Sequence, residues 1–227
     1  MGKKYDVSGL SEAQYEPGSR QLVIKNMLGI KKKSEMDRLE AIALKQAEDA
    51  IFRKYGASHC FTAKDICQMH KLWLGKIYPW AGQYRRVNIS KGSFPFAAAA
   101  HIPQLMEEFE KGQLAKYTPC NFRDKDKIIR ALAEVQVEFI LIHPFREGNG
   151  RVARLIVTLM ALQAGLPLLD FSSVKRKKKD KYFAAVHAGM DRNYKPMEEI
   201  FKEILEVTLS RQEGKRLFLV FFLFLTR

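Results

Sequence analysis

The sequence predicts a mainly α-helical domain that carries one short β-hairpin. Apolar residues recur at helical spacing along most of the 227 residues. Helix-capping patterns precede two of these segments, and one stretch, residues 87–94, is instead rich in β-favouring residues. Because no Pro-, Gly- or Ser-rich linker divides the chain, we expect one compact unit.

The first two helices are predicted from their caps. Ser34 with Asp37, and Thr62 with Asp65, each place a hydroxyl and a carboxylate three residues apart at a helix start. Residues 55–56, Tyr-Gly, are expected to end the first helix. Apolar residues at helical spacing follow each cap: Met36, Leu39, Ile42 and Ile51 in the first helix, and Ile66, Met69 and Trp73 in the second.

A β-hairpin is predicted where this helical pattern stops. Residues 79–85 lead into residues 87–94, in which β-favouring residues flank the Lys-Gly-Ser turn at 91–93. The pattern is typical of an isolated hairpin in an otherwise helical chain.

Helical periodicity resumes after the hairpin. Gly165 and Pro167 are stop signals, Pro196 at a first helical position starts the last helix, and Gly214 is expected to end it. The segments with helical periodicity, in chain order, are Ile102, Leu105, Met106 and Phe109; Ile128, Ile129, Leu132, Val135, Phe139 and Ile142; Leu155, Ile156, Leu159 and Met160; residues 182–190; and Ile200, Phe201, Ile204 and Leu205.

The residues with chemical potential are concentrated in the run 143–154, between two of these helices. Pro144 disfavours helical geometry at His143, so the first helix should end there and present the imidazole. Gly148 and Gly150 permit backbone conformations closed to other residues, which would turn N–H groups toward an anion at the start of the next helix. A histidine beside a phosphate cradle indicates general-base catalysis of attack by a protein hydroxyl on a nucleotide phosphate.

Polar residues in the same run complete a candidate nucleotide site. Arg151 and Arg154 are three residues apart and therefore share a helix face, from which both can hold phosphate oxygens. Asn149 offers an amide hydrogen bond. Glu147 offers a hard oxygen ligand, and one carboxylate with substrate phosphates is a usual way to hold Mg²⁺. Each residue taken singly also fits a helix cap with solvated charges, but the set at this spacing favours a nucleotide site.

Residues 143–154, His-Pro-Phe-Arg-Glu-Gly-Asn-Gly-Arg-Val-Ala-Arg, resemble the full motif of the Fic (filamentation induced by cAMP) family, and the resemblance covers about residues 15–205. It implies a Fic-type helical bundle and a protein adenylyltransferase, which moves AMP from ATP to a Tyr, Ser or Thr hydroxyl of a target protein. The resemblance assigns roles as follows: His143 the base, Glu147 the Mg²⁺ ligand, Gly148, Asn149 and Gly150 the anion hole, Arg154 the γ-phosphate ligand, and Phe145 a buried anchor.

In Fic proteins the hairpin, called the flap, lies over the active site and pairs with the target segment as an added strand. The resemblance implies that Lys91 and Gly92 approach the nucleotide. A related kinase-like branch transfers phosphate, but its motif has lysine where this chain has Gly150. Transfer of phosphocholine or of another nucleotide moiety stays open. A binding module without catalytic activity also stays open, although the intact His143, Glu147 and Arg154 argue against it.

Regulation departs from the usual family pattern. Fic enzymes are commonly inhibited by a helix with Ser/Thr-x-x-x-Glu-Gly/Asn, whose glutamate pairs with the last arginine of the motif. Residues 8–12 have this spacing but are followed by Ala13, and residues 210–214 are one residue short. Residues 15–30 resemble the start of Fic toxins that are inhibited by a separate small antitoxin, so a toxin–antitoxin pair is expected.

The composition is basic, with 39 Lys and Arg against 25 Asp and Glu and a formal net charge of +14. Clusters lie at residues 31–33 and 175–181. Such a field attracts anions without choosing among them, and a solvated face is favoured over a dedicated nucleic-acid site. Because Fic toxins include enzymes that modify type II topoisomerases, a DNA topoisomerase subunit is a candidate target, toward which residues 175–181 would steer the chain.

Two residue types give weaker information. Cys60, Cys67 and Cys120 form no paired motif, and the first residues lack an apolar signal region. We therefore expect the protein to lie in the reducing cytoplasm. Secretion into a host or neighbouring cell is the alternative. The remaining histidines lack metal-ligand spacing and are expected to be surface or core residues: His59, His70, His101 and His187.

We expect a Fic domain at residues 34–214, preceded by an extension at 1–33 and followed by an apolar tail at 215–227. The apolar run 217–225 is too short to cross a bilayer, which takes about 20 residues. A strand added to a sheet edge, a partner-binding tail and out-of-frame sequence are the alternatives for it. Its resemblance to aggregation-prone peptides favours the last.

Overall fold

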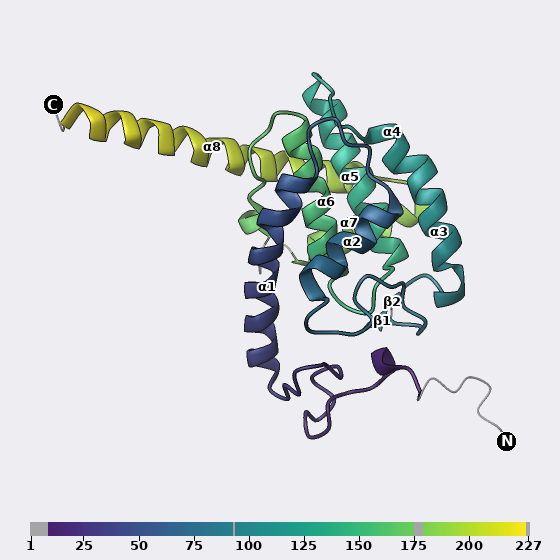
Figure 1. Cartoon of the computed structure of the whole chain (residues 1–227). Coiled ribbons are helices and arrows are strands. Elements are labelled where there is room, and N and C mark those ends of the chain that lie inside the picture. Colours follow the sequence, from purple (N-terminus) through teal and green to yellow (C-terminus); the bar gives the residue numbers. More distant parts are fainter. Residues whose placement is uncertain (1–8, 93, 175–178, 226–227) are drawn as a thin grey trace.

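The computed structural model describes residues 9–92, 94–174 and 179–225, without the side chains of residues 173, 179 and 213–225. This part of the chain is mainly helical and contains one two-stranded antiparallel hairpin, so the predicted fold class is confirmed (Figure 1). The helices and strands are α1 Lys33–Lys54, α2 Ala63–Leu74, β1 Ser90–Lys91, β2 Phe94–Pro95, α3 Ile102–Phe109, α4 Ala115–Tyr117, α5 Lys125–Ile142, α6 Asn149–Gln163, α7 Lys179–Ala188 and α8 Lys195–Leu225. A π-helical turn, Glu110–Leu114, joins α3 to α4.

Helix α5 is the centre of the core. It packs against α3, α6, α7 and α8, and its buried residues lie on all of its sides. A helix that is apolar around most of its circumference has to be buried in this way. Because α5 is held from several directions, its C-terminal end at Ile142 is a fixed point from which the next residue, His143, projects.

The helix starts show which sequence signals decide a boundary. The capping box of α2 is confirmed, because the Thr62 side chain accepts from the Asp65 N–H while the Asp65 side chain accepts from the Thr62 N–H. The predicted cap at Ser34 is wrong: α1 begins at Lys33, and no side chain caps it. Asp37, the expected partner of Ser34, instead forms an ion pair with Lys33 one turn away. The predicted end of α1 at Tyr55 is confirmed.

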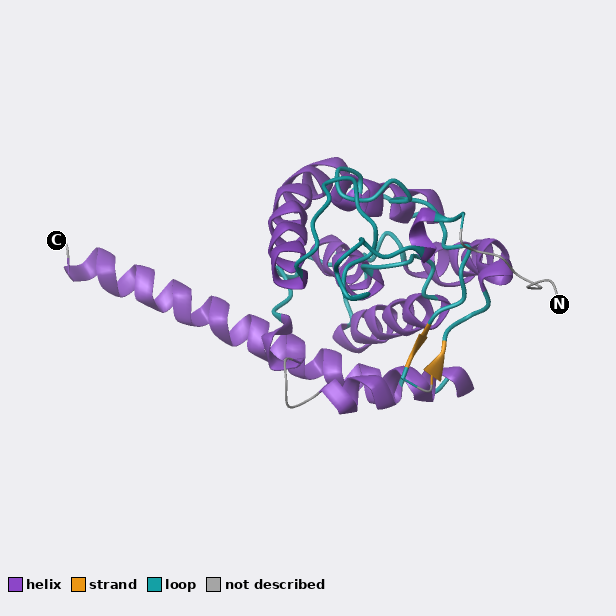
Figure 2. Ribbon diagram, turned by 90° about the horizontal axis from the view of Figure 1, so that it is seen from below, coloured by secondary structure: helices purple, strands orange, loops and turns teal. Residues whose placement is uncertain are grey.

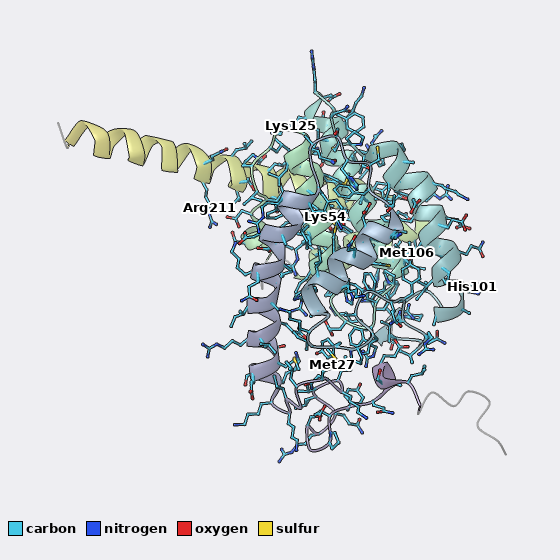
Figure 3. All side chains as sticks on the ribbon, viewed as in Figure 1. Met27, Lys54, His101, Met106, Lys125 and Arg211 are labelled. Carbon is cyan, nitrogen blue, oxygen red and sulfur yellow. The ribbon has the colours of Figure 1, made fainter. Side chains whose placement is uncertain are left out.

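The last helix is longer than predicted. Helix α8 does not end at Gly214 but runs to Leu225 and projects from the body of the molecule (Figure 1). It leaves the body near Arg211, which pairs with Asp170 (Figure 3). Glycine inside a helix costs only about 1 kcal/mol relative to alanine, and its neighbours here are good helix formers. The strand proposed for residues 217–225 is therefore wrong, since this run is helical. Among the described residues, no helix is both long and apolar enough to cross a membrane.

The hairpin is confirmed, with strands of two residues each. Ser90 pairs with Pro95 and Lys91 with Phe94, and Gly92 takes a positive φ of 59° in the turn. Ser93, also in the predicted turn, lies outside the described residues, as do Lys175, Arg176, Lys177 and Lys178 of the basic cluster. The hairpin lies beside α7 (Figure 2), where Phe94 stacks on His187 with ring centroids 4.3 Å apart.

Candidate active site

A cavity of about 1010 Å³ lies between the hairpin, the loop that joins α5 to α6, and helices α7 and α8. Most of the predicted site residues line it, although they come from two separate parts of the sequence. These residues are His143, Glu147, Gly148, Asn149, Gly150 and Arg154 from the loop and α6, and Lys91 and Gly92 from the hairpin. The structure therefore brings the loop motif and the hairpin to one chamber. Arg151 is not among the residues that line it.

His143 ends α5, as Pro144 predicts. Its backbone is left-handed, with φ 51° and ψ 58°. The ring atom Nδ1 lies 3.1 Å from the carbonyl oxygen of Ile140, which can only accept, so Nδ1 carries the hydrogen. In the neutral ring, Nε2 is then left with a lone pair. The ring also stacks on Phe96, with centroids 3.6 Å apart, so its plane is fixed as well as its tautomer.

The surroundings of His143 keep it neutral. Burial lowers the pKa of the imidazole to about 4, with the hydrogen bond to Ile140 opposing the shift and the charge of Arg85 adding to it. At neutral pH the ring is therefore unprotonated, which is the form that accepts a proton from a hydroxyl.

Gly148 is required by both its backbone and its neighbours. Its φ is 85°, and a Cβ atom there would lie 2.6 Å from the Trp73 ring. Gly150 differs: it lies inside α6 with helical geometry, and a Cβ would meet nothing within 4 Å. The expectation that both glycines need unusual backbone geometry is wrong for Gly150. Its missing side chain instead leaves open space beside the start of α6.

The N-terminal end of α6 offers hydrogen-bond donors to an anion. The first intrahelical hydrogen bond is made by the Arg151 N–H to the Gly148 carbonyl, at 3.0 Å. The N–H groups of Asn149 and Gly150 precede it, and such groups have no acceptor within their own helix. Together with the helix dipole they form the kind of site that binds phosphate.

The Asn149 side chain holds the loop together. It is buried, its Oδ1 accepts from the Phe145 N–H at 2.8 Å, and its Nδ2 donates to the Phe145 carbonyl at 2.7 Å. Each of the two bonds leaves capacity on the amide, whose nitrogen has a second hydrogen, so the predicted hydrogen bond from Asn149 to a nucleotide stays a prediction. Phe145 is fully buried, as expected for an anchor, and its ring stacks on His70 at 3.9 Å.

The two helix α6 arginines of the motif, Arg151 and Arg154, point to different places. Arg151 pairs with Glu40 at 2.7 Å and with Glu147 at 3.3 Å, and its guanidinium stacks over the Trp73 ring. Arg154 lines the cavity and donates from Nε to the Gly150 carbonyl at 3.1 Å. Of these two arginines, Arg154 is therefore the one that faces the cavity.

Comparisons with known proteins agree with this geometry. The family model of the Fic/DOC family matches residues 60–161, which include the motif loop and the hairpin. Residues 60–161 are thus similar to a Fic domain. It is 29% identical over 175 residues to the protein adenylyltransferase VbhT of Bartonella schoenbuchensis, covering 77% of this chain and 35% of that protein. The protein adenylyltransferase Fic of Drosophila willistoni is 27% identical over 154 residues, covering 66% and 28%. The chain thus spans about a third of the length of these curated relatives.

Solved structures of Fic domains and Fic effector proteins share the fold of this chain. The BepC protein of Bartonella tribocorum, with bound AMPPNP, superposes with a TM-score of 0.68 at 22% identity, covering 86% of this chain and 97% of that one. The N-terminal Fic domain of a Bartonella quintana effector protein, with bound ADP, superposes with a TM-score of 0.67 at 23% identity, covering 86% and 94%. Both matches extend well beyond the residues of the family model, so the Fic fold includes helices on either side of it.

His70 holds the motif loop in place through hydrogen bonds, a role that the sequence did not predict. It is fully buried, its Nδ1 accepts from the Gly82 N–H at 2.8 Å, and its Nε2 donates to the Glu147 carbonyl at 3.0 Å. Burial lowers its pKa to about 4. Only the neutral ring can make both bonds, so His70 ties α2 and the segment before the flap to the motif loop. The sequence predicted a surface or core residue, and gave no sign of these partners.

Arg85 links the flap to His143, and the sequence did not predict this role either. Its side chain is buried and donates to the carbonyls of His143 at 2.8 Å, Val87 at 2.7 Å and Ala97 at 2.6 Å. These carbonyls belong to the end of α5 and to both sides of the flap. A cation at a helix C-terminus is favourable, which offsets part of the cost of its burial; that burial lowers the pKa of Arg85 to about 10.

Glu147 is the acidic residue among the described residues that line the cavity. Its side chain is 43% exposed, and its Oε1 accepts from the Gly148 N–H at 2.8 Å. The described residues contain no cluster of three His, Cys, Asp or Glu side chains that would hold a metal by themselves. The donor set therefore fits a hard cation shared with substrate phosphates rather than one held by protein ligands alone.

Proposed function

We propose that this chain is a protein adenylyltransferase, which transfers AMP from ATP to a hydroxyl of a target protein and releases pyrophosphate. The proposal rests on one observation: His143, held as the neutral Nδ1–H tautomer, lines the same cavity as the first N–H groups of α6 and Arg154. The names of VbhT and of the Drosophila relative, and the AMPPNP in BepC, support the same activity.

In the proposed reaction, the N–H groups of Asn149 and Gly150 hold the α-phosphate, and Arg154 binds the terminal phosphate. Nε2 of His143 accepts the proton of the target hydroxyl as its oxygen attacks the α-phosphorus. The bond from that phosphorus to the bridging oxygen breaks, and pyrophosphate leaves with the bonding electron pair. The proton stays on His143 until it is lost to solvent, and Arg85 holds the His143 backbone in place throughout.

Glu147 would hold Mg²⁺ together with the phosphates of ATP. The metal ion would supply neutralisation of the charge that develops on the leaving pyrophosphate. The protein positions the Glu147 carboxylate, because the Gly148 N–H donates a hydrogen bond to its Oε1.

The target is expected to bind at the flap. Strand β1 is exposed along both of its residues, and we expect an extended segment of a target to pair with its outer edge. We further propose a cytoplasmic toxin with a separate antitoxin. In its support, Glu12, which belongs to the segment with inhibitory spacing, accepts from the Arg86 backbone N–H at 2.9 Å and does not pair with Arg154; Ser8 lies outside the described residues.

Two labelled forms of ATP test the proposed reaction. The chain is incubated with a cell lysate, Mg²⁺, and ATP labelled on either the α- or the γ-phosphate, and His143→Ala serves as the control. We expect α-label on a protein band with the native chain and none with the variant; intact-mass analysis of that band should show the gain of one AMP. Transfer of the γ-label would identify a kinase instead. ATP binding without any transfer would identify a binding module.

A further inference from the structure

A pair of polar side chains lies in the cavity wall outside the Fic motif. Gln136 on α5 is 1% exposed, and its Nε2 donates to the Tyr182 hydroxyl on α7 at 2.6 Å. Both residues line the cavity. Among the described residues, the Oε1 atom of Gln136 is buried without a hydrogen-bond partner. A buried acceptor left unpaired costs about 1–3 kcal/mol and needs a donor, which a water molecule supplies or, once the amide is turned, the Tyr182 hydroxyl.

The pair lies at the level of Arg154 rather than of His143. Gln136 precedes His143 by seven residues, which is two helical turns, or about 10 Å along α5, on the same face. Helix α6 returns along α5 after the motif loop, and Arg154 lies on its second turn. Tyr182 and Arg154 both line the cavity; burial raises the pKa of the Tyr182 phenol, and the hydrogen bond to Gln136 and the charge of Arg154 oppose the shift.

The pair presents hydrogen-bond donors in either orientation of the Gln136 amide. When Nε2 donates to Tyr182, the phenol keeps its own hydrogen for the cavity. When the amide is turned, the phenol donates to Oε1 and the Nε2 hydrogens are left for the cavity. Donors beside a guanidinium, in a wall where Glu147 is the acidic residue, suit an anion with several acceptor oxygens.

We propose that Tyr182 and Gln136 bind the terminal phosphate of the nucleotide next to Arg154. Tyr182 makes the contact, and Gln136 orients it. This inference rests on the proposed function, because it assigns the end of the triphosphate that leaves as pyrophosphate. It also gives the site a way to distinguish a nucleoside triphosphate from a diphosphate, which lacks the phosphate that the pair would hold.

Tyr182→Phe removes the hydroxyl and keeps the ring that packs in the wall. Dissociation constants for ATP, ADP and AMP with Mg²⁺ are measured by calorimetry on the native chain and the variant. A hydrogen bond to a charged group stabilises binding by about 1.5–3 kcal/mol, so ATP should bind at least about tenfold more weakly. The affinities for ADP and AMP should stay the same, because neither carries the terminal phosphate.

Two further variants separate this contact from a general effect on the fold. Tyr194→Phe is the matched control, since its hydroxyl bonds to Glu138 and its ring does not line the cavity; it should leave all three affinities unchanged. Gln136→Met keeps the length of the side chain but not the amide. We expect it to weaken ATP binding selectively, and by less than Tyr182→Phe does.

The outcomes are distinct. If Tyr182→Phe weakened the binding of ATP and ADP equally, Tyr182 would contact a group that both nucleotides share. If the variant left the ATP affinity unchanged, Tyr182 would not contact the nucleotide. Either result overturns the inference. If the native chain binds ATP but transfers no AMP, the proposed function fails. The change in ATP affinity relative to ADP affinity in Tyr182→Phe still tests the contact with the terminal phosphate. If the native chain binds no ATP, both fail.

Discussion

The motif loop and the flap face each other across one cavity but are built in opposite ways. The loop is held from inside: Asn149 brackets the Phe145 backbone, His70 bonds to the Glu147 carbonyl, and Arg85 bonds to the His143 carbonyl. The flap has two residues in each strand, and β1 is exposed along both. It is held over the cavity by side-chain contacts with α7, including Lys91 over the Phe183 ring at 4.1 Å.

This difference suits two different tasks. Phosphate chemistry needs donors and a base that do not move, because stabilisation of the transition state depends on geometry fixed in advance. Recognition of a target segment needs a backbone edge that is free to accept a new strand. Buried hydrogen bonds give the loop the first property. Short exposed strands, which open at low free-energy cost, give the flap the second.

The largest effect on activity is expected from substitution of His143, the motif-loop residue proposed to deprotonate the target hydroxyl. His143→Ala should lower AMP transfer by about 10²–10⁴-fold, because a positioned general base contributes about that much. ATP affinity should change little, since the N–H groups of α6 and Arg154 remain. Single-turnover transfer and equilibrium ATP binding are measured together. Loss of ATP binding without any further loss of transfer at saturating ATP would contradict the assignment of His143 as the base.

Two glycines of the motif loop should respond oppositely to the same substitution. Gly148→Ala places a side chain on a left-handed residue, at about 1–2 kcal/mol, and against Trp73, where overpacking adds about 1–3 kcal/mol. Urea denaturation should therefore show a loss of about 2–5 kcal/mol in the free energy of unfolding.

Gly150→Ala is the matched control, since its position is helical and open. It should keep or raise stability by up to about 1 kcal/mol, while the added methyl group, beside the first N–H groups of α6, weakens ATP binding. Equal losses of stability in the two variants would show that the loop is not held in the way described.

Sequence signals between residues close in the chain were enough to predict much of this fold. Pro144 after an apolar helix predicted where α5 ends, and the Thr62–Asp65 pair predicted the start of α2; both depend on residues a few positions apart. The hairpin followed from its own β-favouring residues and turn. The nucleotide cradle was predicted for the same reason, because its residues are adjacent in the chain.

Partners that are distant in the chain could not be predicted. Arg151 was expected to face phosphate with Arg154, but Glu40, 111 residues away, holds its guanidinium. His70 and Arg85 bond to backbone groups of the motif loop and of the segments around the flap. Every residue has a backbone carbonyl, so the sequence does not indicate which carbonyl accepts a hydrogen bond from a distant side chain. Arg85 can therefore be recognised only once the fold brings α5 to the base of the flap.

Acid should weaken the contacts that hold the motif loop. The pKa of buried His70 is lowered from 6.5 to about 4, so between these values the unfolded chain binds more protons than the folded one. Stability should therefore be complete above about pH 6.5 and fall as the pH drops, with about 2 kcal/mol lost from this group by pH 5. Denaturation of the native chain and of His70→Gln at pH 8 and pH 5 isolates the contribution. An equal drop in both proteins would contradict it.

The smallest effect is expected at the tip of the flap. Gly92, like Gly148, has a positive φ, 59°, but a Cβ atom there would meet nothing within 4 Å. Gly92→Ala should therefore cost only the backbone term, at most about 1–2 kcal/mol, and mainly within the flap. The unfolding midpoint should scarcely move, while hydrogen exchange at Lys91 speeds up and transfer to the target slows. If Gly92→Ala destabilised the whole domain as much as Gly148→Ala, the flap would be as firmly built as the loop, and the contrast between them would be lost.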